Sequence, residues 1–232
     1  MKLKLYCLPH AGSSAASYLK LKEYINPSIE VCPIELAGRG RRWGQRFYED
    51  VDEAVNDIYN FLGSEIDGKQ YAFLGHSIGA ILAYETIQKL IENKRTVPIH
   101  SFFSGRNPPH ISENSNIHML PDNEIIKELK TLGGTSRELL EDDGLMKFFL
   151  PVIRADYRLS EKYKLKEKKN KLTCSISILN GNDDCQINDE VYKWKTYTDA
   201  KCFFYEFEGD HFFINKHQDK ICKIINKTLL GY

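Results

Sequence analysis

The stretch Gly75-His76-Ser77-Ile78-Gly79 decides the expected fold. It follows a short apolar run at residues 71–74, which indicates a strand, and it opens a run from Ala80 to Leu90 that favours a helix. A serine between two glycines at a strand-to-helix turn is typical of a nucleophile elbow, in which the serine backbone is strained and its hydroxyl projects above the sheet. Small residues at 75 and 79 let the strand and the helix approach closely. We therefore predict that Ser77 is a nucleophile.

A loop near the start of the chain is expected to lie beside this turn. A predicted strand from Leu3 to Leu8 ends in Pro9-His10-Ala11-Gly12-Ser13-Ser14, a small-residue loop whose backbone amides are free to face a ligand. The amide of Ile78, at the N-terminus of the predicted helix, can donate to an oxyanion. We expect Ala11 in the loop to supply the second donor.

The length and composition of the chain indicate one globular domain. The 232 residues are 42% hydrophobic, which suits a single domain with a sizeable core over residues 1–232. The formal net charge is zero, so no overall field favours nucleic acid or an anionic membrane. The N-terminus alternates polar and apolar residues instead of forming a signal peptide, and no later stretch approaches the length of a membrane span. We expect a cytoplasmic monomer.

The six cysteines are scattered and include no C-x-x-C pair, which argues against a disulfide framework or a zinc site. Several fall inside predicted strands. We expect buried free thiols and no metal. The cysteines are Cys7, Cys32, Cys174, Cys185, Cys202 and Cys222.

Strand and helix signals alternate along most of the chain, which predicts an α/β fold with a mostly parallel central sheet and helices on both faces. The predicted strands cover residues 3–8, 29–34, 71–74, 99–104, 172–179 and 201–207, and the predicted helices cover residues 15–24, 51–66, 80–90 and 218–230.

The alternation breaks after residue 104. Pro108 and Pro109 can continue neither a strand nor a helix, and the signals from there to Tyr163 are helical, with glycines at 133 and 134 and a proline at 151. The helices are expected at residues 123–132, 137–140 and 145–163, with a bend at the proline. A block of helices inserted into an α/β alternation is typical of a lid. We predict a helical lid over residues 106–165, with a fixed helical layer as the alternative.

Two further residues complete a catalytic triad with the serine. The strand over 172–179 delivers Asp183 and Asp184 to a turn, and the strand over 201–207 leads to a loop that carries His211. A serine hydroxyl is a poor nucleophile until an imidazole takes its proton, and a carboxylate must hold that imidazole in the right tautomer. The chain order Ser, Asp, His is the one that α/β-hydrolases use. From the residues alone, both aspartates remain candidates, whereas His76 is expected to point away from its neighbour Ser77.

These motifs resemble those of the type II thioesterases that accompany nonribosomal peptide and polyketide synthetases, within the α/β-hydrolase superfamily. The resemblance runs nearly end to end. It is carried by Leu8-Pro9-His10-Ala11-Gly12, Leu36-Ala37-Gly38-Arg39-Gly40-Arg41, the elbow, Arg106-Asn107-Pro108-Pro109, Met119-Leu120-Pro121-Asp122, Leu132-Gly133-Gly134, residues 149–157 (FLPVIRADY), Gly181-x-x-Asp184 and Gly209-Asp210-His211-Phe212-Phe213.

The resemblance implies a serine hydrolase that releases acyl groups from the phosphopantetheine arm of carrier proteins and so edits misprimed or stalled synthetases. It implies neither a metal nor an organic cofactor, and its Gly-x-x-Asp spacing selects Asp184 as the triad acid. The chain departs from the family at His10, Ser13 and Ala37, which affects the oxyanion loop and the pocket entrance. A small-molecule carboxylesterase or lipase with the same triad is the alternative, and a binding module that has lost a triad member is a weaker one.

Two basic clusters are candidates for steering an acidic carrier protein. Arg39, Arg41 and Arg42 lie in a loop that is expected to be flexible, and the alternative is a solvated turn. The second cluster follows the predicted lid and has the same alternative. It contains Lys162, Lys164, Lys166, Lys168 and Lys169.

Overall fold

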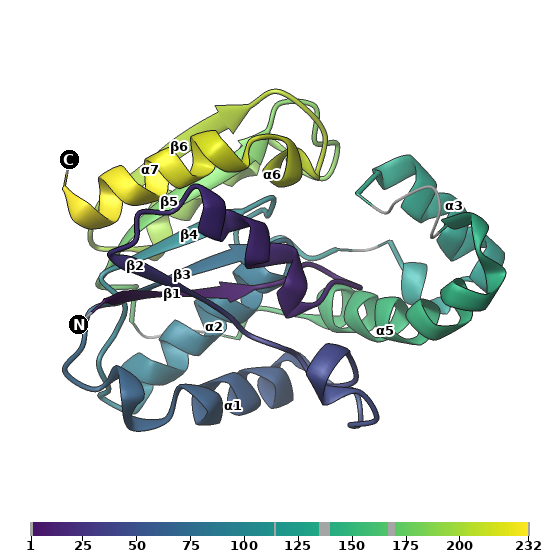
Figure 1. The fold of residues 1–232 in the computed structure, drawn as a ribbon, viewed down its shortest axis with the longest axis horizontal. Helices are drawn as coiled ribbons and strands as arrows, with labels where there is room; N and C mark the ends of the chain where they lie inside the picture. Colours follow the sequence, from purple (N-terminus) through teal and green to yellow (C-terminus); the bar gives the residue numbers. More distant parts are fainter. Residues whose placement is uncertain (1, 114, 135–139, 167–169, 232) are drawn as a thin grey trace.

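The structure is a computed structural model and describes residues 2–113, 115–134, 140–166 and 170–231. Six parallel strands form one sheet in the order β2-β1-β3-β4-β5-β6 (Figure 1). The predicted mostly parallel sheet is therefore confirmed. The strands are β1 (Leu3–Leu8), β2 (Ile29–Pro33), β3 (Tyr71–His76), β4 (His100–Ser104), β5 (Ser175–Gly181) and β6 (Cys202–Phe207).

The register of the sheet aligns the carboxyl ends of its strands. Leu8 at the end of β1 pairs with Gly75 of β3, and His76 pairs with Ser104 at the end of β4. Gly181 at the end of β5 pairs with Phe207 at the end of β6. In an open parallel sheet the loops that follow such ends share one edge, where ligands bind. The small-residue loop, the elbow and the turns after β5 and β6 therefore meet at one edge.

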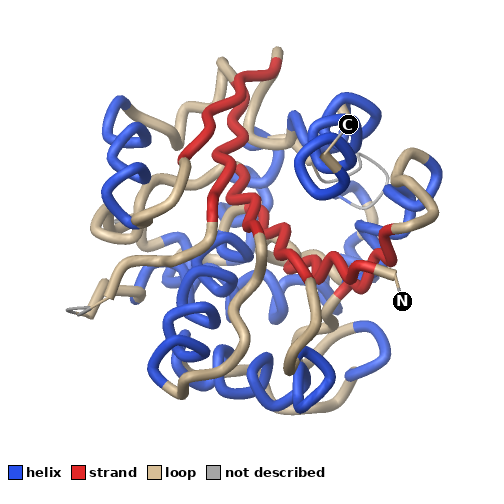
Figure 2. The backbone as a smooth tube through the Cα atoms, turned by 90° about the vertical axis from the view of Figure 1, so that its left-hand side faces the viewer, coloured by secondary structure: helices blue, strands red, loops and turns tan. Residues whose placement is uncertain are grey.

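Helices cover both faces of the sheet, as predicted (Figures 1 and 2). The helices α1 (Val51–Leu62) and α2 (Ile78–Glu92) share one hydrophobic core with the sheet, and the 3₁₀-helix Ala15–Glu23 shares the other core with α7 (Gln218–Leu230). The predicted helix over 15–24 is thus a 3₁₀-helix. The predicted helix over 51–66 ends earlier, because Gly63 adopts a φ of 50° and closes α1.

The insertion between β4 and β5 lies beyond the carboxyl ends of the strands (Figure 1). It contains the 3₁₀-helix Ile117–Met119, α3 (Asp122–Leu132) and α5 (Asp143–Lys162). Pro151 lies inside α5, which is assigned as one helix across it. Residues 137–139 of the predicted short helix lie outside the described residues. The insertion has a small core of its own, formed by Ile117, Ile125, Leu129, Met146, Leu150 and Ile153.

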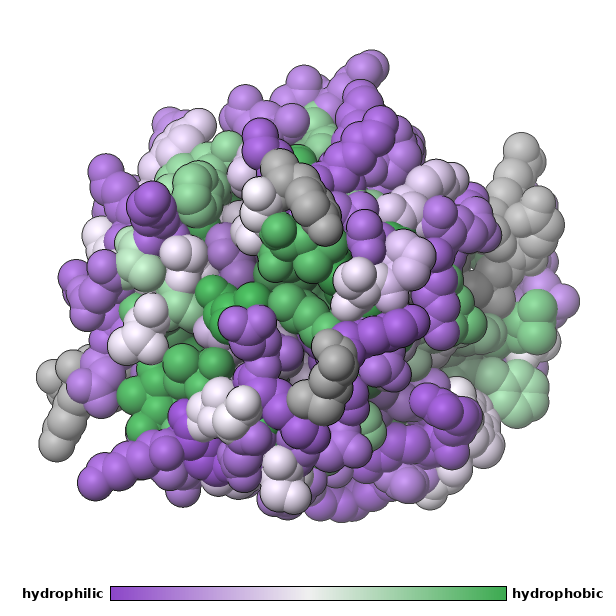
Figure 3. Space-filling model, turned by 60° about the vertical axis from the view of Figure 1, so that its left-hand side comes forward, coloured by the Kyte–Doolittle hydropathy of each residue, from purple (hydrophilic) through white to green (hydrophobic). Residues whose placement is uncertain are grey.

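The remaining short helices connect the main elements. They are the 3₁₀-helices Gly40–Arg42, Gly63–Ile66 and Asp189–Tyr197 and the α-helix α6 (Phe213–Lys216). On the face drawn in Figure 3, hydrophilic residues border the hydrophobic ones that reach the surface. Within the described ranges, no helix combines the length and the apolar character that crossing a bilayer requires.

All six cysteines are free thiols. Cys7, Cys174 and Cys222 are buried, as predicted, whereas Cys185 is exposed and the other two are half-buried. Burial raises the pKa of the Cys174 thiol to about 11 and that of Cys222 to about 12. These thiols are therefore protonated at neutral pH.

Candidate active site

The elbow has the strained geometry that its sequence predicts. Ser77 stands between β3 and α2 with φ 55° and ψ −122°, a left-handed φ that a side chain rarely adopts. A Cβ on Gly75 would lie 2.2 Å from the carbonyl oxygen of Gly79, and a Cβ on Gly79 would lie 2.2 Å from that of Leu8. Only glycine fits at both positions, so the two glycines let the strand and the helix hold the serine in this conformation.

His211 and Asp184 form a buried pair. The imidazole Nδ1 lies 2.7 Å from Asp184 Oδ2, and both residues are buried. The other carboxylate oxygen, Oδ1, accepts a hydrogen bond from the backbone amide of Gln186 at 3.0 Å. Asp183 is exposed and its amide bonds to the carbonyl of Gly209. Of the two candidate aspartates, the structure brings Asp184 to the histidine.

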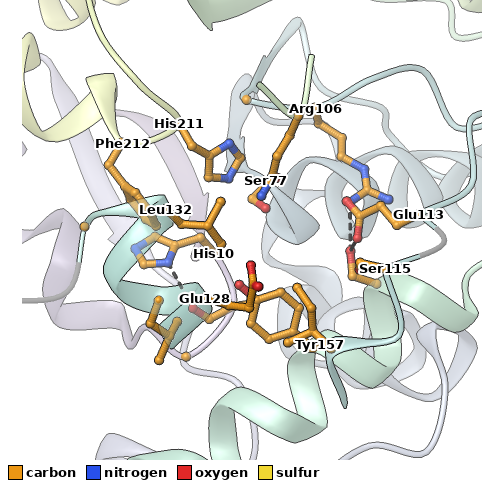
Figure 4. A pocket seen from close by; sticks show the side chains of 18 of the residues that line it. His10, Ser77, Arg106, Glu113, Ser115, Glu128, Leu132, Tyr157, His211 and Phe212 are labelled. Atoms are coloured by element: carbon orange, nitrogen blue, oxygen red, sulfur yellow. Dashed lines mark hydrogen bonds and ion pairs between the residues drawn. The ribbon is translucent and has the colours of Figure 1, made fainter. Parts of the chain in front are cut away.

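Ser77 and His211 line the same cavity, whose volume is about 620 Å³. Figure 4 shows the His211 ring beside Ser77 in this cavity. The amide nitrogen of Ser77 donates to the carbonyl of Ser104 at 2.8 Å, which fixes the turn to the neighbouring strand β4. The cavity thus presents a hydroxyl and an imidazole that come from turns 134 residues apart, at positions 77 and 211.

Two further histidines near the site are neutral. The Nδ1 of His76 lies 2.9 Å from the hydroxyl of Ser104, and the rings of His76 and His211 have centroids 5.0 Å apart. Burial lowers the pKa of His10 to about 4 and that of His76 well below its ordinary value. At neutral pH, a protonated His211 is therefore not repelled by a second imidazolium beside it.

A buried ion pair holds the small-residue loop. The Asp156 carboxylate on α5 accepts two hydrogen bonds from Arg39, at 2.5 and 2.7 Å, and a third from the amide of Gly12 at 2.8 Å. The same guanidinium donates to the carbonyl of Ser13 at 3.0 Å. The Gly12 amide is therefore already engaged with Asp156. Ala11 lines the cavity, so its amide is the one in this loop that can donate to a group bound there. At the elbow, Ile78 is the first residue of α2, so its amide lacks an intrahelical acceptor.

The prediction for the arginine loop was wrong at Arg39. Arg39 is only 4% exposed and pairs with Asp156, so it lies in neither a flexible nor a solvated segment. Arg42 makes two hydrogen bonds to the Asp57 carboxylate. Arg41 alone of the three is exposed. The partner of Arg39 lies 117 residues away, beyond the reach of a local pattern.

The buried pair leads to a stability prediction. Asp156→Asn leaves the guanidinium of Arg39 without its counter-charge, and we expect a loss of about 3 kcal/mol or more in the free energy of unfolding. Denaturant titration measures it. Asp219→Asn, which removes the exposed partner of Lys223 on α7, is the control and is expected to cost under about 1 kcal/mol. Equal losses in the two variants would contradict a structural role for the buried pair.

The cavity wall contains a polar network that the sequence analysis did not predict. The Arg106 side chain is buried, pairs with Glu113 and donates to the Ser160 hydroxyl at 2.8 Å. That hydroxyl in turn donates to the Glu113 carboxylate at 2.5 Å. Burial lowers the pKa of Arg106 to about 10, which leaves it charged at neutral pH.

Within the described ranges, no group of three or more His, Cys, Asp or Glu residues has the arrangement of a metal site.

Comparison with known proteins gives the family. A model of the thioesterase domain matches residues 3–229. The thioesterase PikA5 of Streptomyces venezuelae is 32% identical over 229 residues, which cover 98% of this chain and 81% of that protein. The crystal structure of ClbQ, from the colibactin nonribosomal peptide and polyketide pathway, superimposes with a TM-score of 0.94 at 35% identity and covers 100% of this chain and 98% of ClbQ.

The structure of BorB, the type II thioesterase of the borrelidin cluster, gives a TM-score of 0.90 at 33% identity over 99% of this chain and 93% of BorB. These matches span the whole α/β-hydrolase sheet together with the inserted helices. The resemblance read from the motifs is confirmed, and the chain belongs to the thioesterase domain family, with type II thioesterases of nonribosomal peptide and polyketide pathways among its relatives.

Proposed function

We propose that this protein is a serine thioesterase that releases acyl groups from the phosphopantetheine arm of carrier proteins and so edits misprimed or stalled synthetases. The observation that carries the proposal is the buried Asp184–His211 hydrogen bond beside an elbow serine, in a member of the thioesterase family. PikA5 and BorB are named as thioesterases, which favours this function over a small-molecule carboxylesterase or lipase. The cytoplasmic location and the monomeric state stay predictions from the sequence.

In the proposed mechanism, the Ser77 hydroxyl attacks the thioester carbonyl carbon while His211 Nε2 takes its proton. Asp184 holds the imidazole with Nδ1 protonated, so that Nε2 is free to accept. The amides of Ile78 and Ala11 stabilise the tetrahedral oxyanion. When this intermediate collapses, the carbon–sulfur bond breaks and the departing thiolate takes the proton from His211. Water, whose proton His211 takes, then attacks the carbonyl carbon of the acyl-serine. The carbon–oxygen bond to Ser77 breaks, Ser77 takes the proton back from His211, and the acid is released.

We place the carrier over the cavity mouth, beside the outer surface of α5. Trp43 and Phe148 are 61% and 59% exposed, and their ring centroids lie 6.1 Å apart. Phe149, next to Phe148 in the chain, lines the cavity. Exposed aromatic residues beside an exposed cation, Arg41, suit an acidic partner.

The lysine cluster was the second candidate for steering the carrier. Its Lys166 forms an ion pair with Asp52, and residues 168 and 169 lie outside the described residues.

One assay tests both the reaction and the docking surface. We expect kcat/KM to be highest for an acyl group on a carrier protein, lower for the same acyl group on N-acetylcysteamine, and lowest for its ethyl ester. Arg41→Glu is expected to lower kcat/KM about threefold on the carrier substrate at low salt and less at high salt, because salt screens long-range attraction. The N-acetylcysteamine thioester needs no docking surface, so its turnover should not change.

Lys223→Glu, an exposed charge reversal on α7, is the matched control and should leave both substrates unaffected. Faster turnover of the ethyl ester than of either thioester would overturn the thioesterase proposal. An equal loss on the carrier and small thioesters in Arg41→Glu would show that this arginine shapes the cavity and does not steer the carrier.

A further inference from the structure

The cavity wall below Ser77 holds one carboxylate without a partner. Besides His10, His211 and Tyr157, three titratable side chains line the cavity: Arg106, Glu113 and Glu128. Arg106 and Glu113 form an ion pair with each other. Glu128, on α3, makes neither a hydrogen bond nor an ion pair in the part of the chain that the structure describes. The wall therefore carries one uncompensated negative charge.

The surroundings of Glu128 raise the cost of leaving that charge unpaired. Its side chain is half-buried, and the neighbouring α3 residues Leu129 and Leu132 line the same cavity. Figure 4 shows Glu128 and Tyr157, from α3 and α5, projecting into the space on the Ser77 side of these helices. A carboxylate partly removed from water is stabilised when a cation reaches it.

Tyr157 adds a second feature that suits a cation. Burial and the nearby carboxylates of Glu161 and Glu128 raise the pKa of Tyr157 to about 12, so its phenol is neutral at neutral pH. The negative face of a neutral phenol ring attracts an ammonium group, and the attraction grows when water is excluded. A carboxylate and an aromatic ring on one cavity wall complement a protonated amine.

We propose that Glu128 is a specificity-determining residue that binds a protonated amino group on the acyl chain of the substrate. The proposal rests on the proposed function, because it takes the acyl carbonyl to lie at Ser77 and the chain to extend into the cavity. The substrate class is then acyl thioesters that carry a protonated amine, such as aminoacyl thioesters. Acyl chains of the same length without the amine leave the carboxylate unpaired and are hydrolysed less efficiently.

The test compares amine-bearing thioesters with their neutral counterpart. The substrates are the alanyl, β-alanyl and propionyl thioesters of N-acetylcysteamine, assayed at a pH below the pKa of the substrate amine. Because a protonated amine also activates the neighbouring carbonyl, the decisive quantity is the change in the amine-to-propionyl ratio of kcat/KM between enzymes. Glu128→Gln keeps the shape of the side chain and removes its charge. We expect it to lower this ratio about tenfold or more for at least one of the two amines, as loss of a charged hydrogen bond does.

Glu124→Gln is the matched control. This carboxylate lies one turn earlier on α3, 3.9 Å from Lys127, and is not part of the cavity wall, so its ratio should equal that of the wild type. An unchanged ratio in Glu128→Gln for both amines, with propionyl hydrolysis intact, overturns this inference alone. If propionyl hydrolysis is not lost in Ser77→Ala, the proposed function fails, and the inference fails with it.

Discussion

Replacement of Ser77 by alanine is expected to lower kcat about 10⁶-fold, because triad members act as a unit and a variant without the nucleophile retains only the contribution of binding and oxyanion stabilisation. Ser77 has the strained φ of 55° and lines the cavity together with His211. The measurement is release of the thiol from an acyl N-acetylcysteamine thioester, followed with a thiol reagent. Circular dichroism checks that the variant folds.

Ser112→Ala is the control for this prediction, because Ser112 also lines the cavity but lies outside the elbow. Its kcat should stay within a few-fold of the wild type. A fluorophosphonate probe should label Ser77 of the wild type and nothing in Ser77→Ala. Retained turnover in Ser77→Ala, or a probe adduct on another serine, would remove Ser77 from the role of nucleophile.

Asp184→Asn is expected to lower kcat by up to ~10⁴, because the amide no longer holds His211 in the tautomer that accepts a proton at Nε2. The carboxylate accepts from His211 Nδ1 at 2.7 Å and from the Gln186 amide at 3.0 Å. An asparagine keeps the volume of the side chain, so the effect is on the orientation and protonation of the imidazole and not on packing. The same thiol-release assay measures it.

Asp183→Asn provides the matched control, since the neighbouring carboxylate is exposed. Its kcat should change less than about threefold, as is usual for surface substitutions. A large loss in Asp183→Asn together with a small one in Asp184→Asn would reassign the triad acid.

The elements that carry the site were predictable because their signals are local. The glycines at 75 and 79 mark a close strand-to-helix turn, and the alternation of strand and helix fixes a parallel sheet whose carboxyl ends share an edge. Once the sheet is parallel, the turns after β5 and β6 must lie at the same end of the sheet as the elbow. From the residues alone Asp183 and Asp184 could not be separated, because burial and side-chain direction in a tight turn depend on the opposing chain.

The ion pairs were not predictable, because each joins residues with no local pattern in common. Arg39 looked like one of three surface cations until its partner on α5 was known, 117 residues away. Arg106 and Glu113 are close in sequence, but the hydroxyl of Ser160, which bonds to both, comes from α5. In each case the buried arginine is stabilised by a counter-charge whose position only the folded structure reveals.

The ion pair between Asp156 and Arg39 marks a division of the insertion into two parts. We call the second half of α5, from Asp156 onward, the root, and the preceding residues of the insertion the outer part. Asp156 fixes the second half of α5 to the loop that carries Ala11, whereas α3 packs through Ile125 and Leu129 against Met146, Leu150 and Ile153, in a small core separate from the two that flank the sheet. The outer part also supplies Glu128 to the cavity. Exchange of the outer part between relatives therefore changes the cavity wall that carries Glu128 and leaves the bond between Asp156 and the loop in place. Substrate choice in such an enzyme can diversify over evolution while the groups that perform the acyl transfer are inherited unchanged.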